Sequence, residues 1–263
     1  MKKSCLMPIK RSALGSIPPL FCVHGEPLLI TQELKAERSV YALNCIYEAN
    51  SIEDAPVEIE VLASRYISEI KKVQPSGPYF LYGFCTGAMV AYEMALQLTK
   101  NGDLVRHLLL SCPSVGSPRS LETAKTIIIA LGSNGFSMMR LKNVLKIIAR
   151  IFRHLPGFIA MQLKILRYKL MGRMPPELMM ELHLLRLRPA RQKYRYKPIN
   201  CKIEVIDGQL NKEQLARSAK AWSDIAGVAV KTYTVSEADG HMDLLQLPIA
   251  AKRTAELIDR AVI

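Results

Sequence analysis

Long apolar runs are missing from this chain of 263 residues, although 49% of its residues are hydrophobic. No stretch reaches the roughly 18 uncharged apolar residues that a membrane-crossing helix needs, so we expect no membrane span. The basic start Met1–Lys3 is followed by Lys10 and Arg11, which interrupt the apolar region that a signal peptide would require. We therefore expect a cytoplasmic protein, folded as one domain over residues 1–263.

Cysteine pairs of the C-x-x-C type and His-rich tracts are also missing, and the six cysteines are scattered along the chain. Such spacing argues against a zinc site and against a disulfide-stabilised scaffold. We predict no bound metal and no cofactor, and we expect most of the cysteines to be small core residues. Aromatic residues are scarce, at 6%, but the many Leu, Ile, Val and Met residues exclude a disordered chain.

The net charge of +13 is concentrated in one part of the chain. Residues 140–197 contain 15 Lys or Arg and only 2 Glu, whereas the remaining residues carry equal numbers of basic and acidic side chains. This pattern is typical either of a solvated helical face or of a docking surface for an acidic partner. Nucleic acid is the less favoured partner, because few aromatics interleave with the basic residues and no nucleic-acid motif is present.

Segments with strand and helix patterns alternate along most of the chain. Short apolar runs predict strands at 20–23, 39–43, 79–82, 108–110, 201–206 and 228–235. Apolar residues at helical spacing predict helices at 59–73, 88–98, 213–224 and 249–262. Such alternation predicts the α/β class, with a mostly parallel sheet, helices on both of its faces and ligands at the carboxyl ends of the strands.

Residues 120–192 interrupt the alternation with two or three basic amphipathic helices, the last of them opening at Pro175-Pro176. We predict that they form an inserted helical lid over the active site. A pair of helices lying on a membrane surface would have the same pattern.

Gly83-Phe84-Cys85-Thr86-Gly87 lies between a predicted strand and a predicted helix. It matches the G-x-S-x-G nucleophile elbow, with Cys in the Ser position. The turn is so sharp that side chains at Gly83 and Gly87 would collide with backbone. Cys85 would stand at a helix N-terminus, where the dipole favours a thiolate, and the N–H of Thr86 would face an oxyanion.

The candidate general base is His241, in a loop that follows the predicted strand 228–235. Histidine is suited to this role because its pKa lies near working pH. We expect His24 to be structural or to line the oxyanion loop, and His107, His154 and His183 to lie on surfaces or in the lid.

The residue that would orient His241 has two candidates, Asn211 and then Asp207, which ends the strand 201–206. An Asn can hold an imidazole beside a thiolate, as in Cys-His-Asn enzymes. The other usual position, after the strand 108–110, offers no carboxylate.

These motifs together resemble the thioesterase domains of nonribosomal peptide and polyketide synthetases. The matching pieces are Pro19–Gly25, Val40–Leu43, Ala63–Ile67, Val73–Tyr79 with the elbow, Ala91–Ala95 and Tyr194–Pro198. The resemblance implies an α/β-hydrolase fold and activity on acyl groups that carrier proteins hold as phosphopantetheine thioesters.

Three features depart from that family. The nucleophile is Cys85 rather than Ser, and Cys112 occupies the position after the elbow strand where these domains often carry Asp. The glycine-rich loop expected after His24 is replaced by Gly25-Glu26-Pro27, so we predict that the N–H of Glu26 is the second oxyanion donor, since Pro27 has none.

A Cys nucleophile exchanges one thioester for another, which is close to thermoneutral, so the acyl group keeps its activation. We therefore predict an acyl- or aminoacyltransferase of natural-product (antibiotic) biosynthesis that works between carrier proteins, whose usual acidity would suit the basic lid. A chain without its own carrier domain fits such a shuttle. The alternatives are a stand-alone thioesterase that hydrolyses carrier-bound acyl groups, and a non-catalytic hydrolase-fold protein that binds a partner or a membrane surface.

Overall fold

The computed structural model describes residues 4–13, 15–24, 27–47, 55–113, 176–239 and 242–262. Apart from residues 176–179, these residues belong to one compact unit, which comprises Met1–Val115 and Met180–Ile263. Most of the predicted lid, residues 120–175, lies outside the described residues. Its predicted last helix is present as α6, Pro176–Arg186.

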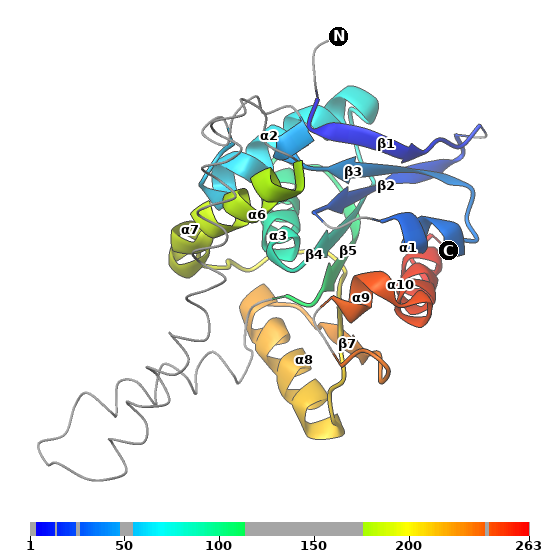
Figure 1. Ribbon diagram of the computed structural model, residues 1–263, viewed down its shortest axis with the longest axis vertical. Helices are drawn as coiled ribbons and strands as arrows, with labels where there is room; N and C mark the ends of the chain where they lie inside the picture. Colours follow the sequence, from blue (N-terminus) through cyan, green and yellow to red (C-terminus); the bar gives the residue numbers. More distant parts are fainter. Residues whose placement is uncertain are drawn as a thin grey trace, which may run out of the picture. The chain divides into compact units, whose positions relative to one another are not determined.

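A seven-stranded sheet forms the centre of the unit, with the order β1-β3-β2-β4-β5-β6-β7 (Figure 1). The strands β2 to β7 are parallel to their neighbours, and only β1 runs antiparallel, at the edge beside β3. The strands are β1 Leu6–Lys10, β2 Ile17–Val23, β3 Arg38–Leu43, β4 Tyr79–Phe84, β5 Val105–Ser111, β6 Ile203–Asp207 and β7 Lys231–Thr234. The mostly parallel sheet of the predicted α/β class is confirmed.

Helices cover both faces of this sheet. The helices are α1 Leu28–Glu33, α2 Ile59–Val73, α3 Thr86–Lys100, α7 Arg188–Lys193, α8 Lys212–Ala226, α9 Asp243–Gln246 and α10 Pro248–Arg260, with a short 3-10 helix, η1, at Cys45–Tyr47. One face packs against α1, α9 and α10, whose apolar residues share a core with β2, β4 and β6. The other face packs against α3, which contacts α2 and, through Tyr92 and Trp222, α8.

The parallel strands form where apolar residues run without interruption, because both faces of the sheet are covered. All six residues of β4 are buried, and so are the last four of β2. In α2, by contrast, the buried residues recur at helical spacing, which is why its predicted range, 59–73, agrees with the observed one.

The order of the strands identifies one place in this sheet where ligands can bind. From β2 the chain passes to β3 on one side and then returns to β4 on the other side. Such a switch of direction leaves a crevice at the carboxyl ends of the two central strands, where ligands bind in open α/β sheets. In this chain β2 ends beside His24 and β4 ends beside Cys85.

Candidate active site

Cys85 is the single residue between β4 and α3. Its backbone conformation is one that non-glycine residues seldom adopt. Its φ is 54° and its ψ is −115°. Such a conformation costs on the order of 1–3 kcal/mol and persists only where the surroundings enforce it. The backbone N–H of Cys85 donates to the carbonyl of Ser111 at 2.9 Å, and the N–H of Ala88 donates to the carbonyl of Cys85 at 3.1 Å. These bonds fix the turn between the strand and the helix.

The two glycines of the motif permit close backbone approaches on both sides of the turn. A Cβ on Gly83 would lie 2.5 Å from the carbonyl oxygen of Gly87. A Cβ on Gly87 would lie 2.0 Å from the carbonyl oxygen of Val23 and 2.8 Å from the Cβ of His24. Both positions therefore need glycine, as the motif predicts.

The helix that follows Cys85 gives the site its electrostatic character. Thr86 is the first residue of α3, a helix of 15 residues, so its N–H has no intrahelical partner. The Cys85 Sγ lies 3.9 Å from the Thr86 Oγ1, and Thr86 is buried. The positive end of the helix dipole thus lies at the Cys85 thiol, which favours its thiolate form.

The side chains of Cys112 and Asp207 lie at the same end of the sheet as Cys85. Cys112 follows β5, has a φ of 46° and donates its N–H to the carbonyl of Ile206 at 2.9 Å. Burial raises the pKa of the Cys112 thiol, and a hydrogen bond to the Asp207 carboxylate and the nearby Cys85 raise it further. Asp207 also accepts a hydrogen bond from the N–H of Gly208 at 2.9 Å. The three side chains Cys85, Cys112 and Asp207 are therefore neighbours.

Asn211, the first candidate to orient the base, takes part in helix capping. Its side-chain oxygen accepts a hydrogen bond from the N–H of Gln214 at 2.8 Å, and the Gln214 side chain accepts one from the N–H of Asn211 at 3.0 Å. This reciprocal capping box begins α8. Asp207, by contrast, lies beside Cys112, and the choice between the two residues stays a prediction.

Two candidate residues lie outside the described residues. These are His241, the predicted base, and Glu26, the predicted second oxyanion donor, and both roles stay predictions. The described chain leaves β7 and continues to Asp239, and it resumes at Met242 just before α9.

His24 packs directly behind the elbow and is structural. Its Nε2 lies 2.9 Å from the hydroxyl of Tyr66, and its ring lies 6.3 Å from the ring of His183 in a T-shaped arrangement. The His183 Nε2 lies 3.3 Å from the Cys45 Sγ. Burial lowers the pKa of His24 to about 3, helped by His183, and burial lowers the pKa of His183 to about 4, helped by Arg186. Both imidazoles are therefore neutral near pH 7.

Of the histidines predicted to lie on surfaces or in the lid, His107 is buried within the sheet instead, whereas His183 lies on the last helix of the predicted lid. The His107 Nε2 lies 2.7 Å from the Glu204 Oε2 between β5 and β6. His183, on α6, is fully buried against Cys45. The prediction was wrong for His107 because its hydrogen bond to Glu204, which is distant in the sequence, offsets the free-energy cost of burying the imidazole. His154 lies outside the described residues.

The described part of the basic region extends from α7 to the loop that precedes β6. Between 187 and 200 it has no acidic residue and five basic ones, Arg188, Arg191, Lys193, Arg195 and Lys197. All but Arg191 are exposed. We call these five residues the basic segment.

Two tyrosines anchor the basic segment to α3. The Tyr194 hydroxyl donates to the Glu93 Oε2 at 2.6 Å, and the Tyr92 hydroxyl donates to the carbonyl of Lys197 at 2.9 Å. The rings of Tyr92 and Tyr196 pack edge to face, 4.9 Å apart. The charges are therefore presented on a fixed backbone.

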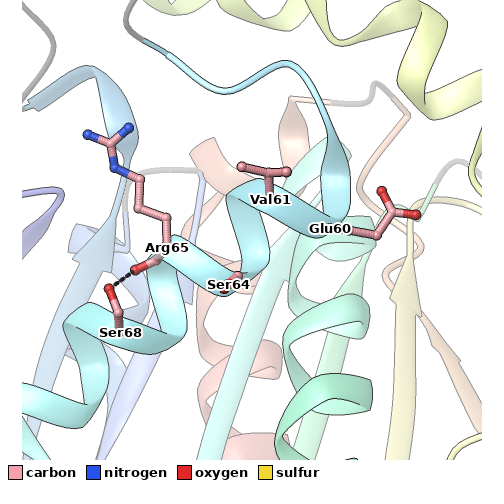
Figure 2. A pocket seen from close by; sticks show the side chains of 5 residues that line it. All are labelled: Glu60, Val61, Ser64, Arg65 and Ser68. Carbon is pink, nitrogen blue, oxygen red and sulfur yellow. Dashed lines mark hydrogen bonds between the residues drawn. The ribbon is translucent and has the colours of Figure 1, made fainter.

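An open pocket of about 470 Å³ lies along α2 (Figure 2). Its lining residues share one face of that helix, and they are Glu60, Val61, Ser64, Arg65 and Ser68. Figure 2 shows the Ser68 hydroxyl bonded to the carbonyl of Arg65, at 2.8 Å. None of the candidate catalytic residues lines this pocket, so we do not assign it to the acyl group.

Neither a metal cluster nor a membrane helix is found in the part of the chain that the structure describes. No three His, Cys, Asp or Glu side chains of these residues are grouped so that they could hold a metal ion. Likewise, none of their helices is long and apolar enough to cross a bilayer.

Similarity to known proteins covers the elbow. The family model of the thioesterase domain matches residues 30–127. A nonribosomal peptide synthetase of Aspergillus terreus, pngA, is 40% identical over 105 residues, which are 38% of this chain and 11% of that protein. The dimodular nonribosomal peptide synthase of Bacillus subtilis is 34% identical over 114 residues, 40% of this chain and 4% of that one. The chain thus spans a small part of the length of these relatives.

Solved structures extend the similarity in fold to nearly the whole chain. A four-domain nonribosomal peptide synthetase bound to AMP and glycine matches with a TM-score of 0.68 and 21% identity, covering 98% of this chain and 20% of that one. The NocB thioesterase domain, in covalent complex with a fluorophosphonate nocardicin G analogue, matches with a TM-score of 0.61 and 19% identity, covering 98% and 99%. The chain has the fold of the thioesterase domains of nonribosomal peptide synthetases, and its residues 30–127 match the thioesterase-domain family, as the motifs predicted.

Proposed function

We propose that this protein is an acyl- or aminoacyltransferase that takes an acyl group from the phosphopantetheine arm of one carrier protein and passes it through Cys85 to the thiol of a second carrier. The observation that carries the proposal is the position of Cys85, in a strained turn at the N-terminus of α3 and at the switch point of the sheet. That position exposes a thiol and stabilises its thiolate.

In the first step, the Cys85 thiolate attacks the carbonyl carbon of the carrier-bound thioester. The bond between this carbon and Cys85 Sγ forms, the bond to the pantetheine sulfur breaks, and His241 supplies the proton that the departing thiol takes. The N–H groups of Thr86 and Glu26 would stabilise the oxyanion of the tetrahedral intermediate. In the second step another pantetheine thiol attacks the Cys85 thioester, with His241 taking its proton.

Asp207 is the residue that we propose to orient His241. It ends β6, and the chain that leaves the neighbouring strand β7 leads to His241. A carboxylate in this position would hold the imidazole in the required tautomer and would stabilise its charged form. Asn211 is the weaker candidate because its side-chain oxygen already caps α8.

The thiol nucleophile favours transfer over hydrolysis. Exchange between two thioesters is close to thermoneutral, whereas an oxygen ester on a serine would lose the activation of the acyl group. Similarity to nonribosomal peptide synthetases supports carrier domains as the source of the acyl group.

We propose that an acidic carrier protein docks on the basic segment. It begins one helical turn beyond His183, since the N–H of Leu187 donates to the carbonyl of His183 at 2.9 Å. His183 in turn packs against His24, which lies directly behind Gly87. The segment is therefore near enough to the elbow for a carrier bound there to present its flexible arm to Cys85.

Intact-protein mass spectrometry with two carrier proteins tests this function. One carrier is loaded with an acyl group, the other has a free pantetheine thiol, and the enzyme is added in catalytic amount as wild type or Cys85→Ala. Transfer of the acyl mass to the second carrier by the wild type alone supports the proposal. Release of free acid without transfer would make the protein a hydrolytic thioesterase. If the loaded carrier lost its acyl group equally fast with Cys85→Ala, Cys85 would be excluded as the nucleophile.

A further inference from the structure

Cys85 has a second thiol beside it, at the end of the neighbouring strand. β4 and β5 are parallel, and Phe84 pairs with Ser111 in their last register. Cys85 and Cys112 directly follow the two strands, and the backbone hydrogen bond from the N–H of Cys85 to the carbonyl of Ser111, at 2.9 Å, keeps the two strand ends together. The register therefore places the two cysteines side by side.

The spacing of the two strand ends lies within the range that a disulfide spans. Neighbouring strands lie about 4.7–4.9 Å apart, and the Cα atoms of a disulfide lie about 4.4–6.8 Å apart. Both side chains pack against the same core cluster, the one that includes Phe84 and Leu109. Both are also partly exposed, so a small oxidant can reach them.

The other cysteines of the chain do not offer such a pairing with Cys85. Cys5, Cys22 and Cys45 are fully buried. Cys201 is partly exposed but precedes β6, at the opposite end of the sheet from Cys85. Cys112 thus stands out as the thiol with both access and position.

Asp207 holds Cys112 in its thiol form. Its carboxylate is hydrogen-bonded to the Cys112 thiol, and burial together with this carboxylate raises the pKa of that thiol. Cys112 consequently stays protonated while Cys85 is reduced, and it does not compete with Cys85 for acyl groups.

We propose that Cys112 is a resolving thiol that forms a reversible disulfide with Cys85 when the site meets a peroxide. The inference adds a means of regulation to the proposed active site and rests on Cys85 being its reactive thiol. Hydrogen peroxide oxidises the Cys85 thiolate to a sulfenic acid and leaves hydroxide. The Cys112 thiol sulfur then attacks the Cys85 sulfur, the S–S bond forms, and the sulfenic oxygen leaves as water with the proton of the Cys112 thiol. Two thiols and one peroxide give one disulfide and two waters, and a low-molecular-weight thiol reverses the change.

Peptide mapping of the peroxide-treated protein tests the inference. The wild type, Cys112→Ser and Cys201→Ser are treated with hydrogen peroxide, remaining thiols are blocked with N-ethylmaleimide, and tryptic peptides are analysed without reduction. We expect a linked pair of peptides containing Cys85 and Cys112 in the wild type and in Cys201→Ser. In Cys112→Ser we expect Cys85 to reach the sulfinic acid, which dithiothreitol does not reverse.

Two outcomes would overturn the inference. One is oxidation of Cys85 to the sulfinic acid in the wild type with no linked pair, and the other is a linked pair that joins Cys85 to Cys201. The wild-type map needs no variant, so it remains decisive even if Cys112→Ser fails to fold. Acylation of Cys85 is measured separately, so its absence beside a formed disulfide would reject the proposed function and leave this inference standing.

Discussion

A Cβ added to Gly87 would lie 2.0 Å from the carbonyl oxygen of Val23, so the start of α3 touches the end of β2 with no space for a methyl group. An alanine within a helix ordinarily stabilises by about 1 kcal/mol relative to glycine. At Gly87 we expect the opposite sign, because the backbone of Val23 or of Gly87 itself must move to make room.

We predict that Gly87→Ala lowers the free energy of unfolding by about 3 kcal/mol or more, since overpacking against backbone cannot be relieved by a rotamer change. The matched control is Gly102→Ala, where a Cβ meets nothing within 4 Å and only the positive φ of 81° is unfavourable. That change should cost about 1–2 kcal/mol. Urea unfolding of the two variants measures the difference, and equal losses would contradict the close approach.

Substitutions of Asp207 and Asn211 should change different properties, the rate of acylation for Asp207 and the stability for Asn211. Asp207→Asn should lower the rate of Cys85 acylation by about a hundredfold and shift its pH profile, because the carboxylate would no longer orient and charge-stabilise the base. Asn211→Ala should leave the rate near that of the wild type and cost about 1 kcal/mol of stability, since it removes a helix cap. A large rate loss for Asn211→Ala with no loss for Asp207→Asn would reverse the assignment.

The basic segment should affect recognition of the carrier rather than chemistry. The double variant Arg188→Glu, Lys197→Glu should raise the KM for an acidic carrier by about tenfold, because each reversal removes an attraction and adds a repulsion. Its KM for a small acyl-pantetheine thioester should not change. Each of the two reversals is also made singly and compared with Lys220→Glu, at an exposed lysine on α8, which changes the charge by the same amount as one reversal. Equal effects of all three changes would indicate net charge alone.

The buried imidazoles beside the elbow make stability depend on pH. The folded pKa values of His24 and His183, about 3 and about 4, lie below the ordinary value of 6.5. The unfolded chain therefore binds more protons, so this part of the stability is full above about pH 6.5 and falls as the pH decreases.

We expect His183→Gln to remove part of this dependence. Between pH 6.5 and pH 5 the free energy of unfolding should fall further in the wild type than in a chain without the buried histidine. The difference should be about 2 kcal/mol for each such histidine, at about 1.4 kcal/mol per pH unit. Unfolding by urea at both pH values measures the loss for each protein. Identical losses in wild type and variant would show that His183 does not contribute.

Much of the fold followed from apolar patterning. Runs such as 79–82 and 108–110 predicted buried parallel strands, and the structure extends them to Tyr79–Phe84 and Val105–Ser111. The edge strand β1 and the short helix α1 were not predicted. None of the residues of β1 is fully buried and they lack alternation, and the six residues of α1 are too few to establish a helical period.

The elbow was predictable because its geometry depends on glycines at fixed spacing, whereas the pairing of Cys112 with Asp207 was not. These residues are 95 positions apart in the sequence, and only the register of β5 with β6 brings them together. The sequence showed at Cys112 only the lack of a carboxylate. Similarly, the capping role of Asn211 depends on where α8 begins, and element boundaries are poorly determined by pattern.

The most direct test of the account is whether Cys85 becomes acylated. The protein is mixed with an acyl-pantetheine thioester for a single turnover, quenched in acid and mapped by mass spectrometry. We predict an acyl mass on the peptide that contains Cys85, lost on treatment with hydroxylamine and absent from Cys85→Ala. An unmodified Cys85, with the thioester consumed equally fast by Cys85→Ala, would contradict the role of Cys85 as the nucleophile.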